Sequence, residues 1–150
     1  MKFYLGIDQG TTGVTALLFD KDFAPVARGY HKITQFYPAP NHVEHDPEQI
    51  LAAVISATDE AMKKANATPE EIIAVGIDHE GESAMMWERE SGKPIYPSIV
   101  WQDRRTVARA EELKAAHGTL FCEKTGLVPD AYFSATKLEW LMKNIPQAST

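Results

Sequence analysis

The first twenty residues run from a short apolar segment into a turn rich in glycine and threonine, and then into a second apolar segment. The apolar segments are residues 3–7 and 14–19, and between them lies Asp8-Gln9-Gly10-Thr11-Thr12-Gly13. Two such segments joined by so short a turn predict an antiparallel hairpin. The hairpin commits the chain to opening with a sheet, and it leaves a polar turn at the sheet edge.

The composition of this turn indicates phosphate binding. We expect Gly10 and Gly13 to adopt backbone angles closed to other residues, so that successive N–H groups point into one concavity. Thr11 and Thr12 add hydroxyl donors. Asp8 would repel phosphates unless a divalent cation lay between them, and we therefore interpret it as facing Mg²⁺ and its waters. The competing interpretation is an ordinary hairpin turn with a capping aspartate.

The sequence excludes two common phosphate-binding motifs and predicts a mixed sheet. It contains neither Gly-x-x-x-x-Gly-Lys-Ser/Thr nor a Gly-x-Gly-x-x-Gly that opens a helix. A third strand is predicted over 25–30. Asp46 and Pro47 then begin an amphipathic helix that extends to about residue 65, and the apolar run 72–77 is typical of a strand buried on both faces. This order predicts a parallel strand after a crossover helix.

The second half of the chain predicts shorter strands and further helices. Strands are expected over 83–87 and 95–101, followed by a helix over 104–116 that Gly118 ends and by a helix that Ser134 caps. We expect the adjacent Arg104 and Arg105 to form the solvated first turn of the earlier helix.

Several blocks of the sequence, in order and at similar spacing, resemble the FGGY family of carbohydrate kinases, and its glycerol kinases most closely. The resemblance covers nearly the whole chain. The blocks are Gly6-Ile7-Asp8-Gln9-Gly10-Thr11-Thr12, Val43-Glu44-His45-Asp46-Pro47-Glu48, Ser91-Gly92-Lys93-Pro94-Ile95-Tyr96, Ile99-Val100-Trp101-Gln102-Asp103-Arg104-Arg105-Thr106, Glu123-Lys124-Thr125-Gly126-Leu127 and Tyr132-Phe133-Ser134-Ala135-Thr136-Lys137. The resemblance implies an α/β, actin-like or ribonuclease-H-like ATPase fold, with a mixed sheet opened by antiparallel hairpins and with flanking helices.

The resemblance assigns roles to the residues of the turn. It implies that Asp8 contacts phosphate and Mg²⁺, the ion either directly or through its bound water. ATP would be bound by Gly10, Thr11, Thr12, Gly13 and Thr15, and Thr11 would also touch the phosphorylated product. Glycerol kinases usually place an arginine at Thr15, so this chain lacks a positive charge there.

The resemblance also places the substrate. Glu82 matches a carboxylate that accepts hydrogen bonds from substrate hydroxyls, and Gly81 replaces an arginine that would donate to them. That replacement removes charge-assisted hydrogen bonds of about 1.5–3 kcal/mol each and opens space for a bulkier polyol or ketose. Trp101 and Tyr132 match an aromatic wall and a hydroxyl contact. The competing interpretations are a solvated strand-end carboxylate for Glu82 and a plain core residue for Trp101.

Residues 1–150 are expected to form part of the family's N-terminal lobe, and the rest of that lobe and the C-terminal lobe are absent from this chain. In the family a later aspartate is the catalytic base, so the base is not expected here. The function implied is that of a fragment of an ATP-dependent kinase acting on a hydroxyl of glycerol or a related polyol or sugar. A free-standing, non-catalytic actin-like module that binds a nucleotide or a protein is the alternative, and a phosphatase-like hydrolase using Asp20 is a third.

Composition limits the partners. The 150 residues are 44% hydrophobic, enough for a core, and suggest one domain. A net charge of −6 without a basic run argues against nucleic acid, and the absence of a leader or a long apolar run indicates a cytoplasmic protein without a membrane partner. Cys122 is expected to be buried. Family members often form dimers or tetramers, so the resemblance allows a homo-oligomer.

Overall fold

The protein, represented by a computed structural model, is described for residues 1–149, and it forms two compact units. The first unit comprises residues 1–35 and 46–80, and the second comprises residues 36–45 and the chain from Gly81 onward. The chain leaves the first unit twice, after Gln35 and after Glu80, and the assignment of residues 1–150 to one partial lobe stays a prediction. Thr150, the last residue of the expected domain, lies outside the described residues.

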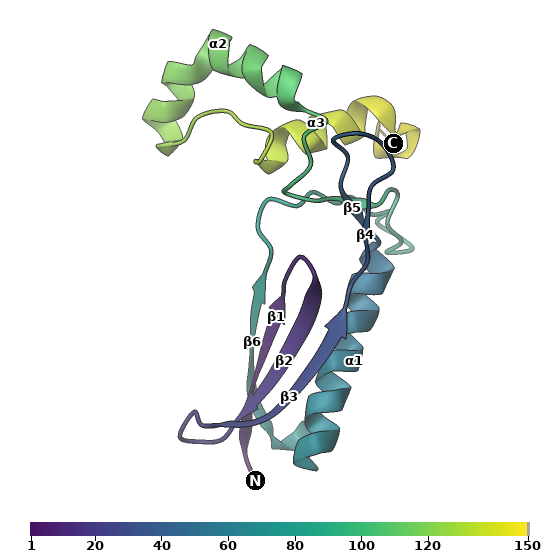
Figure 1. Cartoon of the computed structure of the whole chain (residues 1–150), viewed down its shortest axis with the longest axis vertical. Coiled ribbons are helices and arrows are strands. Elements are labelled where there is room, and N and C mark those ends of the chain that lie inside the picture. The colour runs from purple at the N-terminus through teal and green to yellow at the C-terminus, as the bar shows by residue number, and fades with distance from the viewer. Residues whose placement is uncertain (150) are drawn as a thin grey trace. The chain divides into compact units, whose positions relative to one another are not determined.

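The first unit is built on a mixed four-stranded sheet in the order β3-β2-β1-β6 (Figure 1). Its strands are β1 (Phe3–Gln9), β2 (Gly13–Phe19), β3 (Pro25–Lys32) and β6 (Ile72–His79). β1 pairs antiparallel with β2, β2 pairs antiparallel with β3, and β1 pairs parallel with β6. The predicted opening hairpins, and the parallel strand after a crossover helix, are thus confirmed.

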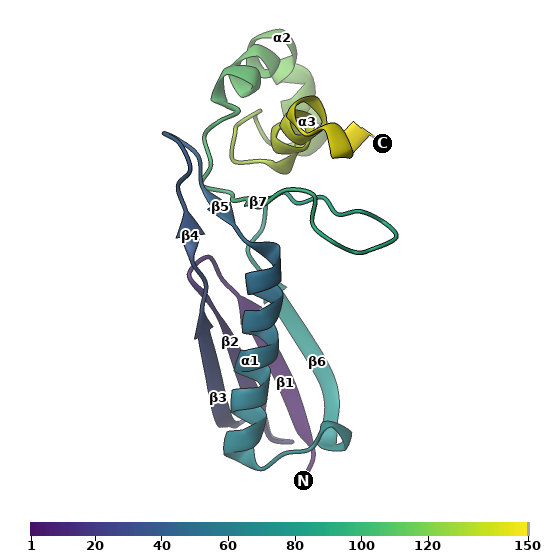
Figure 2. The same cartoon turned by 90° about the vertical axis from the view of Figure 1, so that its right-hand side faces the viewer.

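One long helix covers β2 and β3 on one face of this sheet, as Figure 2 shows. This helix, α1 (Pro47–Ala65), begins where Asp46 accepts a hydrogen bond of 2.9 Å from the amide of Glu48, and it ends at Asn66 with a φ of 50°. A 3₁₀ turn, η1 (Pro69–Glu71), leads on to β6. The core of the unit comprises Phe3, Leu5, Ile7, Val14, Ala16, Leu18, Ala53, Ala57 and Ala61.

The expectation that residues 72–77 are buried on both faces is wrong. Val75 and Ile77 are 52% and 70% exposed. They pair in register with Leu5 and Ile7 and so lie on the face that α1 packs against. Within the first unit, α1 packs mainly against β2 and β3 and leaves this edge strand largely uncovered.

The second unit contains little regular strand. β4 (Gln35–Phe36), β5 (Glu44–His45) and β7 (Ser98–Ile99) form a short sheet in the order β4-β5-β7. The strands expected over 83–87 and 95–101 are reduced to β7 and to isolated bridges that join Ala84 to Ile99 and Trp87 to Pro94. Because these bridges are isolated, most of the two predicted strands is irregular.

The helices of the second unit begin and end at different residues from those predicted. α2 (Val107–Thr125) continues through Gly118, because one internal glycine costs a helix only about 1 kcal/mol. It ends at Gly126, whose φ of 74° suits glycine. α3 (Ser134–Asn144) and the 3₁₀ turn η2 (Pro146–Ser149) follow. Cys122, expected to be buried, is exposed on α2.

The two adjacent arginines precede α2 and differ from each other. Arg104 is partly exposed and pairs with Asp130 at 2.9 Å. The side chain of Arg105 is only 1% exposed and forms ion pairs with Asp103 at 2.8 Å and with Glu44 at 2.7 Å. The predicted solvated first turn is therefore wrong for Arg105, because the carboxylates of neighbouring Asp103 and of distant Glu44 compensate for its burial.

The packing of β3 against α1 generates a stability prediction. A Cβ added at Gly29 would lie 1.9 Å from the carbonyl oxygen of Ala57, which is backbone and cannot move aside. We expect Gly29→Ala to lower the free energy of unfolding by about 2–3 kcal/mol, measured by urea denaturation followed by circular dichroism. The matched control is Gly118→Ala, whose Cβ would meet only a Lys114 side-chain carbon at 3.8 Å; it should be neutral or stabilising. Equal midpoints for Gly29→Ala and the parent protein would contradict the prediction.

Candidate functional site

The turn between β1 and β2 requires glycine because it has no room for a side chain at Gly13. Neither Gly10 nor Gly13 has a φ in the left-handed region, so the expected unusual backbone angles are wrong. A Cβ on Gly13 would lie 2.5 Å from the hydroxyl oxygen of Tyr30 and 2.7 Å from the carbonyl oxygen of His31. A side chain at Gly13 would therefore displace β3 from the turn.

One of the expected amide donors is engaged within the turn. The amide of Gly10 donates to the carbonyl oxygen of Gly13 at 3.1 Å. Thr12 lies exposed at the tip and Thr11 is half-buried. In this conformation the amide of Gly10 is therefore not free to donate to a phosphate. Contact of these residues with a nucleotide stays a prediction.

Asp8 lies at the carboxyl end of β1 and borders an open hollow of 410 Å³ on the first unit. Because Leu5 and Ile7 face α1, the alternation of the strand puts Asp8 on the opposite face. The hollow is lined by Gly6, Ile7, Asp8, Thr15, Leu17, Phe19, Gly76, Ile77 and Asp78. The carboxylate is exposed and available to a bound ion.

A second carboxylate that sequence reasoning missed lies beside Asp8. Asp8 pairs in register with Asp78 across the parallel β1–β6 ladder, and both line the hollow. The signal was present in the sequence, because Gly-Ile-Asp occurs at residues 6–8 and again at 76–78. Two neighbouring carboxylates repel each other unless a cation or a proton lies between them. Their hard oxygen donors suit Mg²⁺.

A cation lies next to Thr15, although the sequence lacks the family's usual arginine there. Arg28 on β3 donates from Nη2 to the hydroxyl of Thr15 at 3.2 Å, and its guanidinium lies 5.2 Å from the centre of the Tyr30 ring. Thr15 in turn pairs with Asp8 across the β1–β2 ladder. A positive charge from the neighbouring strand therefore lies beside Thr15.

The carboxylate of Glu82, in the second unit, is fixed by hydrogen bonds from Ser134. One oxygen, Oε2, accepts hydrogen bonds of 2.7 Å from both the amide and the hydroxyl of Ser134. No described residue donates to the other oxygen, Oε1. The N-cap of α3 is Phe133, so the predicted capping role of Ser134 is wrong: its hydroxyl binds Glu82 instead. The interpretation of Glu82 as a merely solvated carboxylate does not hold.

Trp101 and Tyr132 lie together in the same unit. Their ring centres are 5.9 Å apart, with the rings at 67°. Trp101 is half-buried and Tyr132 is 40% exposed, so neither is a plain core residue. Gly81 precedes Glu82 and is exposed, and a Cβ there would meet nothing within 4 Å. A side chain at this position would therefore start in open space.

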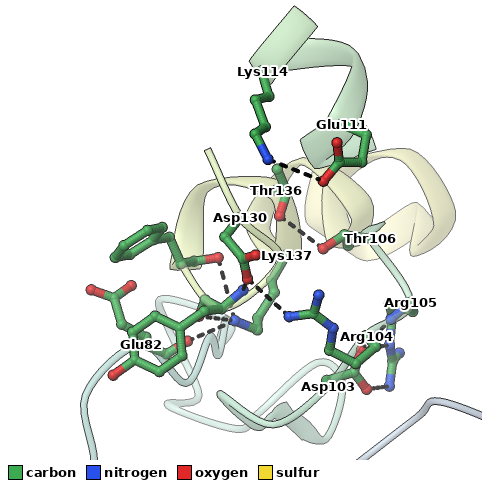
Figure 3. A network of polar contacts seen from close by, with 12 residues as sticks. Glu82, Asp103, Arg104, Arg105, Thr106, Glu111, Lys114, Asp130, Thr136 and Lys137 are labelled. Carbon is green, nitrogen blue, oxygen red and sulfur yellow. Dashed lines mark hydrogen bonds and ion pairs between the residues drawn. The ribbon is translucent and has the colours of Figure 1, made fainter. Parts of the chain in front are cut away.

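A buried lysine joins the segments that carry these residues, and sequence reasoning did not identify it as a site residue. Lys137 donates to the carbonyl oxygens of Glu82 at 3.1 Å and of Tyr132 at 2.5 Å, and Figure 3 shows Lys137 beside Glu82. In the sequence, Lys137 was noted only as the last residue of the block 132–137 that resembles the kinase family.

The predicted site residues therefore form two groups. Asp8, Gly10, Thr11, Thr12, Gly13 and Thr15 belong to the first unit, and Gly81, Glu82, Trp101 and Tyr132 belong to the second. Over residues 1–149, no group of three or more histidine, cysteine, aspartate or glutamate side chains is placed to hold a metal ion. None of the described helices has the length and apolar character needed to cross a membrane.

Comparison with known proteins gives strong matches over almost the whole chain. It is 45% identical over 147 residues to glycerol kinase 2 of Sulfolobus acidocaldarius, covering 98% of this chain and 30% of the relative. It is 46% identical over 145 residues to glycerol kinase of Thermococcus kodakarensis, covering 97% of this chain and 29% of the relative. The chain thus spans less than a third of the length of these relatives.

Solved structures of carbohydrate kinases share the fold of this chain. The crystal structure of Plasmodium falciparum glycerol kinase with ADP matches with a TM-score of 0.91 and 31% identity, covering 99% of this chain and 30% of that one. A xylulose kinase from Lactobacillus acidophilus, at 21% identity and a TM-score of 0.88, shares the fold over 99% of this chain and 30% of its own. The expected actin-like α/β fold is confirmed.

The two groups of site residues come from a chain whose residues 3–150 match the N-terminal domain of one family. Together with the identity to the archaeal relatives, this match establishes that the chain belongs to the FGGY family of carbohydrate kinases.

Proposed function

We propose that this chain is the first part of an ATP-dependent kinase that phosphorylates a hydroxyl of glycerol or of a related polyol or sugar. The observation that carries the proposal is the carboxylate of Glu82, held through Oε2 by Ser134 while Oε1 accepts nothing from described residues. A carboxylate fixed in this way is suited to accept a hydrogen bond from a substrate hydroxyl. The kinase activity of the similar glycerol kinases supports the assignment.

The first unit would bind the nucleotide. Hydroxyls of Thr11 and Thr12 would donate to phosphate oxygens, and Arg28, beside Thr15, would offset their charge. Asp8 and Asp78 would hold Mg²⁺, directly or through its waters. When bound, magnesium ATP supplies the phosphoryl group and part of the positive charge that its transfer requires. The chain's own contribution is orientation and charge.

The second unit would bind the acceptor. Glu82 would accept from its hydroxyls, Tyr132 would offer its own hydroxyl, and the face of Trp101 would pack against carbon-bound hydrogens. Open space at Gly81 favours an acceptor longer than glycerol. Positioning alone does not remove the proton from the acceptor hydroxyl, so the base is proposed to lie outside this chain.

The two other functions are less well supported. Asp20 lies in the β2–β3 turn, where one carboxylate oxygen accepts from the amides of Asp22 at 2.9 Å and Ala24 at 3.0 Å. That engagement favours a structural role over nucleophilic attack. A non-catalytic module that binds a nucleotide or a protein remains the alternative, and reading the coding sequence beyond codon 150 distinguishes it, because the kinase proposal requires a second lobe.

We further propose that the protein is cytoplasmic and acts on a small molecule, without nucleic acid or membrane as a partner. The net charge of −6 supports the exclusion of nucleic acid. Assembly into homo-oligomers is proposed only by analogy with the family.

The proposed division of labour predicts that residues 1–150 alone have no kinase turnover. The chain would orient the substrates in part, while the base and the closing lobe would be missing. A coupled assay of ADP release with glycerol, erythritol, ribitol, xylulose and ribulose should give rates equal to the no-enzyme control. The full-length coding product is the positive control, and turnover by the 150-residue chain would contradict the prediction.

The open space at Gly81 predicts acceptor preference. In the full-length kinase, a polyol or ketose longer than glycerol should give the larger thermal shift and the higher kcat/KM. Gly81→Arg should reverse the order by roughly tenfold or more, because it adds donors for a short acceptor and fills the space. Gly81→Ala, which adds a Cβ that touches nothing, should keep the parent's preference. A parent enzyme that prefers glycerol would defeat the argument.

The paired carboxylates predict magnesium dependence. Asp8→Asn should lower kcat/KM for magnesium ATP by about 100-fold, and Asp78→Asn should raise the magnesium concentration needed for half-maximal rate by roughly tenfold, because each removes a charged ligand. Asp22→Asn serves as the matched control, since Asp22 is exposed in the β2–β3 turn. An Asp78→Asn enzyme with an unchanged magnesium requirement would show that Asp8 acts without it.

A further inference from the structure

We propose that Lys137 is a positioning residue that fixes the acceptor-binding segments around Glu82 and Tyr132 by binding their main-chain carbonyl groups. The proposal rests on the function proposed above and deepens it. It assigns the precision of the acceptor site to one buried ammonium group, which binds main-chain carbonyl groups.

The geometry around the ammonium group is that of a three-way junction. Nζ of Lys137 donates to the carbonyl oxygens of Glu82 at 3.1 Å, Tyr132 at 2.5 Å and Phe133 at 3.3 Å. An ammonium group has three N–H donors, so all of them are used. Lys137 thus joins the acceptor segment at residue 82 to the segment that carries Tyr132, and Figure 3 shows the dashed line between Lys137 and Glu82.

Burying the charge of Lys137 costs free energy, which argues against a role in packing alone. Its side chain is 0% exposed, and burying a cation is unfavourable unless it is well bonded. It lies in the first turn of α3, where the helix dipole disfavours positive charge. No described carboxylate forms an ion pair with it. An apolar residue would fill the space without these penalties, so the charge has a use that packing does not explain.

Glu82 needs such support because its own backbone is strained. Its φ is 64°, a left-handed conformation that is uncommon for a residue with a side chain. The Lys137 bond holds the carbonyl group of Glu82, while Ser134 holds its carboxylate. Fixed at both ends, Glu82 can present only Oε1 outward. Loss of the Lys137 bonds would let the backbone relax and turn the carboxylate away.

The titration of the ammonium group offers a check that needs no substitution. Burial lowers the pKa of Lys137 to about 8, and Arg104 adds to the lowering, whereas Asp103, Glu82 and Asp130 oppose it. Above that pH the group loses a donor and its charge. The acceptor site should therefore loosen as the pH rises through about 8.

The first test uses the 150-residue chain and does not depend on activity. In Lys137→Met, hydrogen exchange measured by NMR at the amide of Ser134, which donates to Glu82, should quicken roughly tenfold or more. Exchange at the amide of Ile145, at the other end of α3, should stay within a factor of two. Lys143→Met, at a 64% exposed side chain of the same helix, is the matched control. Unchanged exchange at Ser134 would overturn the proposal.

The second test separates positioning from general damage in the full-length kinase. Lys137→Met should raise KM for the acceptor by roughly 10–100-fold and leave KM for ATP within about threefold. The acceptor KM of the parent should rise above about pH 8, while that of Lys137→Met should be flat. Equal increases in both KM values would indicate a merely structural lysine and overturn the proposal.

Ser134→Ala covers the case in which Lys137→Met does not fold. It removes the hydroxyl donor to Glu82 and leaves the lysine in place, so it should raise the acceptor KM several-fold with the same selectivity. An unaltered acceptor KM would count against the positioning of Glu82. An inactive parent enzyme would instead refute the proposed function, and the exchange measurement would still decide the role of Lys137.

Discussion

The register of β1 with both of its neighbours is the constraint on which the first unit depends. Asp8 pairs with Thr15 across the antiparallel β1–β2 ladder and with Asp78 across the parallel β1–β6 ladder. Because side chains alternate along a strand, a slip of one residue would send Asp8 into the apolar layer against α1 and bring Ile7 out. The core residues Leu5 and Ile7 therefore fix the position of the carboxylate. The alignment of β1 with β2 and β6 therefore determines both the packing of the core and the position of the Asp8 carboxylate.

The second unit depends on buried charges instead of a large apolar core. Arg105, with a side chain 1% exposed, is held between Asp103 and Glu44 and lies 4.6 Å from the centre of the Trp140 ring. Lys137 binds three carbonyl groups at the start of α3. Such networks are costly to bury and penalise any arrangement that leaves a member without a partner. Such networks suit a region with short strands, where the hydrogen bonds between strands are too few to fix the loops.

Local sequence signals predicted much of the first unit. The β1–β2–β3 hairpins, the start of α1 at Asp46 and its end near residue 65 follow from turn composition, capping and period. The same reasoning failed where a partner decided the outcome. The run 72–77 appeared suited to burial on both faces, yet Val75 and Ile77 are exposed because α1 lies over other strands. Gly118 did not stop α2, because a single glycine is a weak breaker inside a long helix.

The sequence by itself determined the family, the order of strands and helices around the opening hairpin, and the first set of residues to which the proposed chemistry is assigned. Those follow from motifs and from periods of a few residues. Only the tertiary structure placed Asp78 beside Asp8, Arg28 beside Thr15 and Lys137 beneath Glu82. Each of these pairs joins residues that are distant in sequence, and the contact depends on strand register or on burial. The repeated Gly-Ile-Asp hinted at the first of these contacts, but local pattern alone does not establish any of them, because the energy of a contact exists only once both segments are in place.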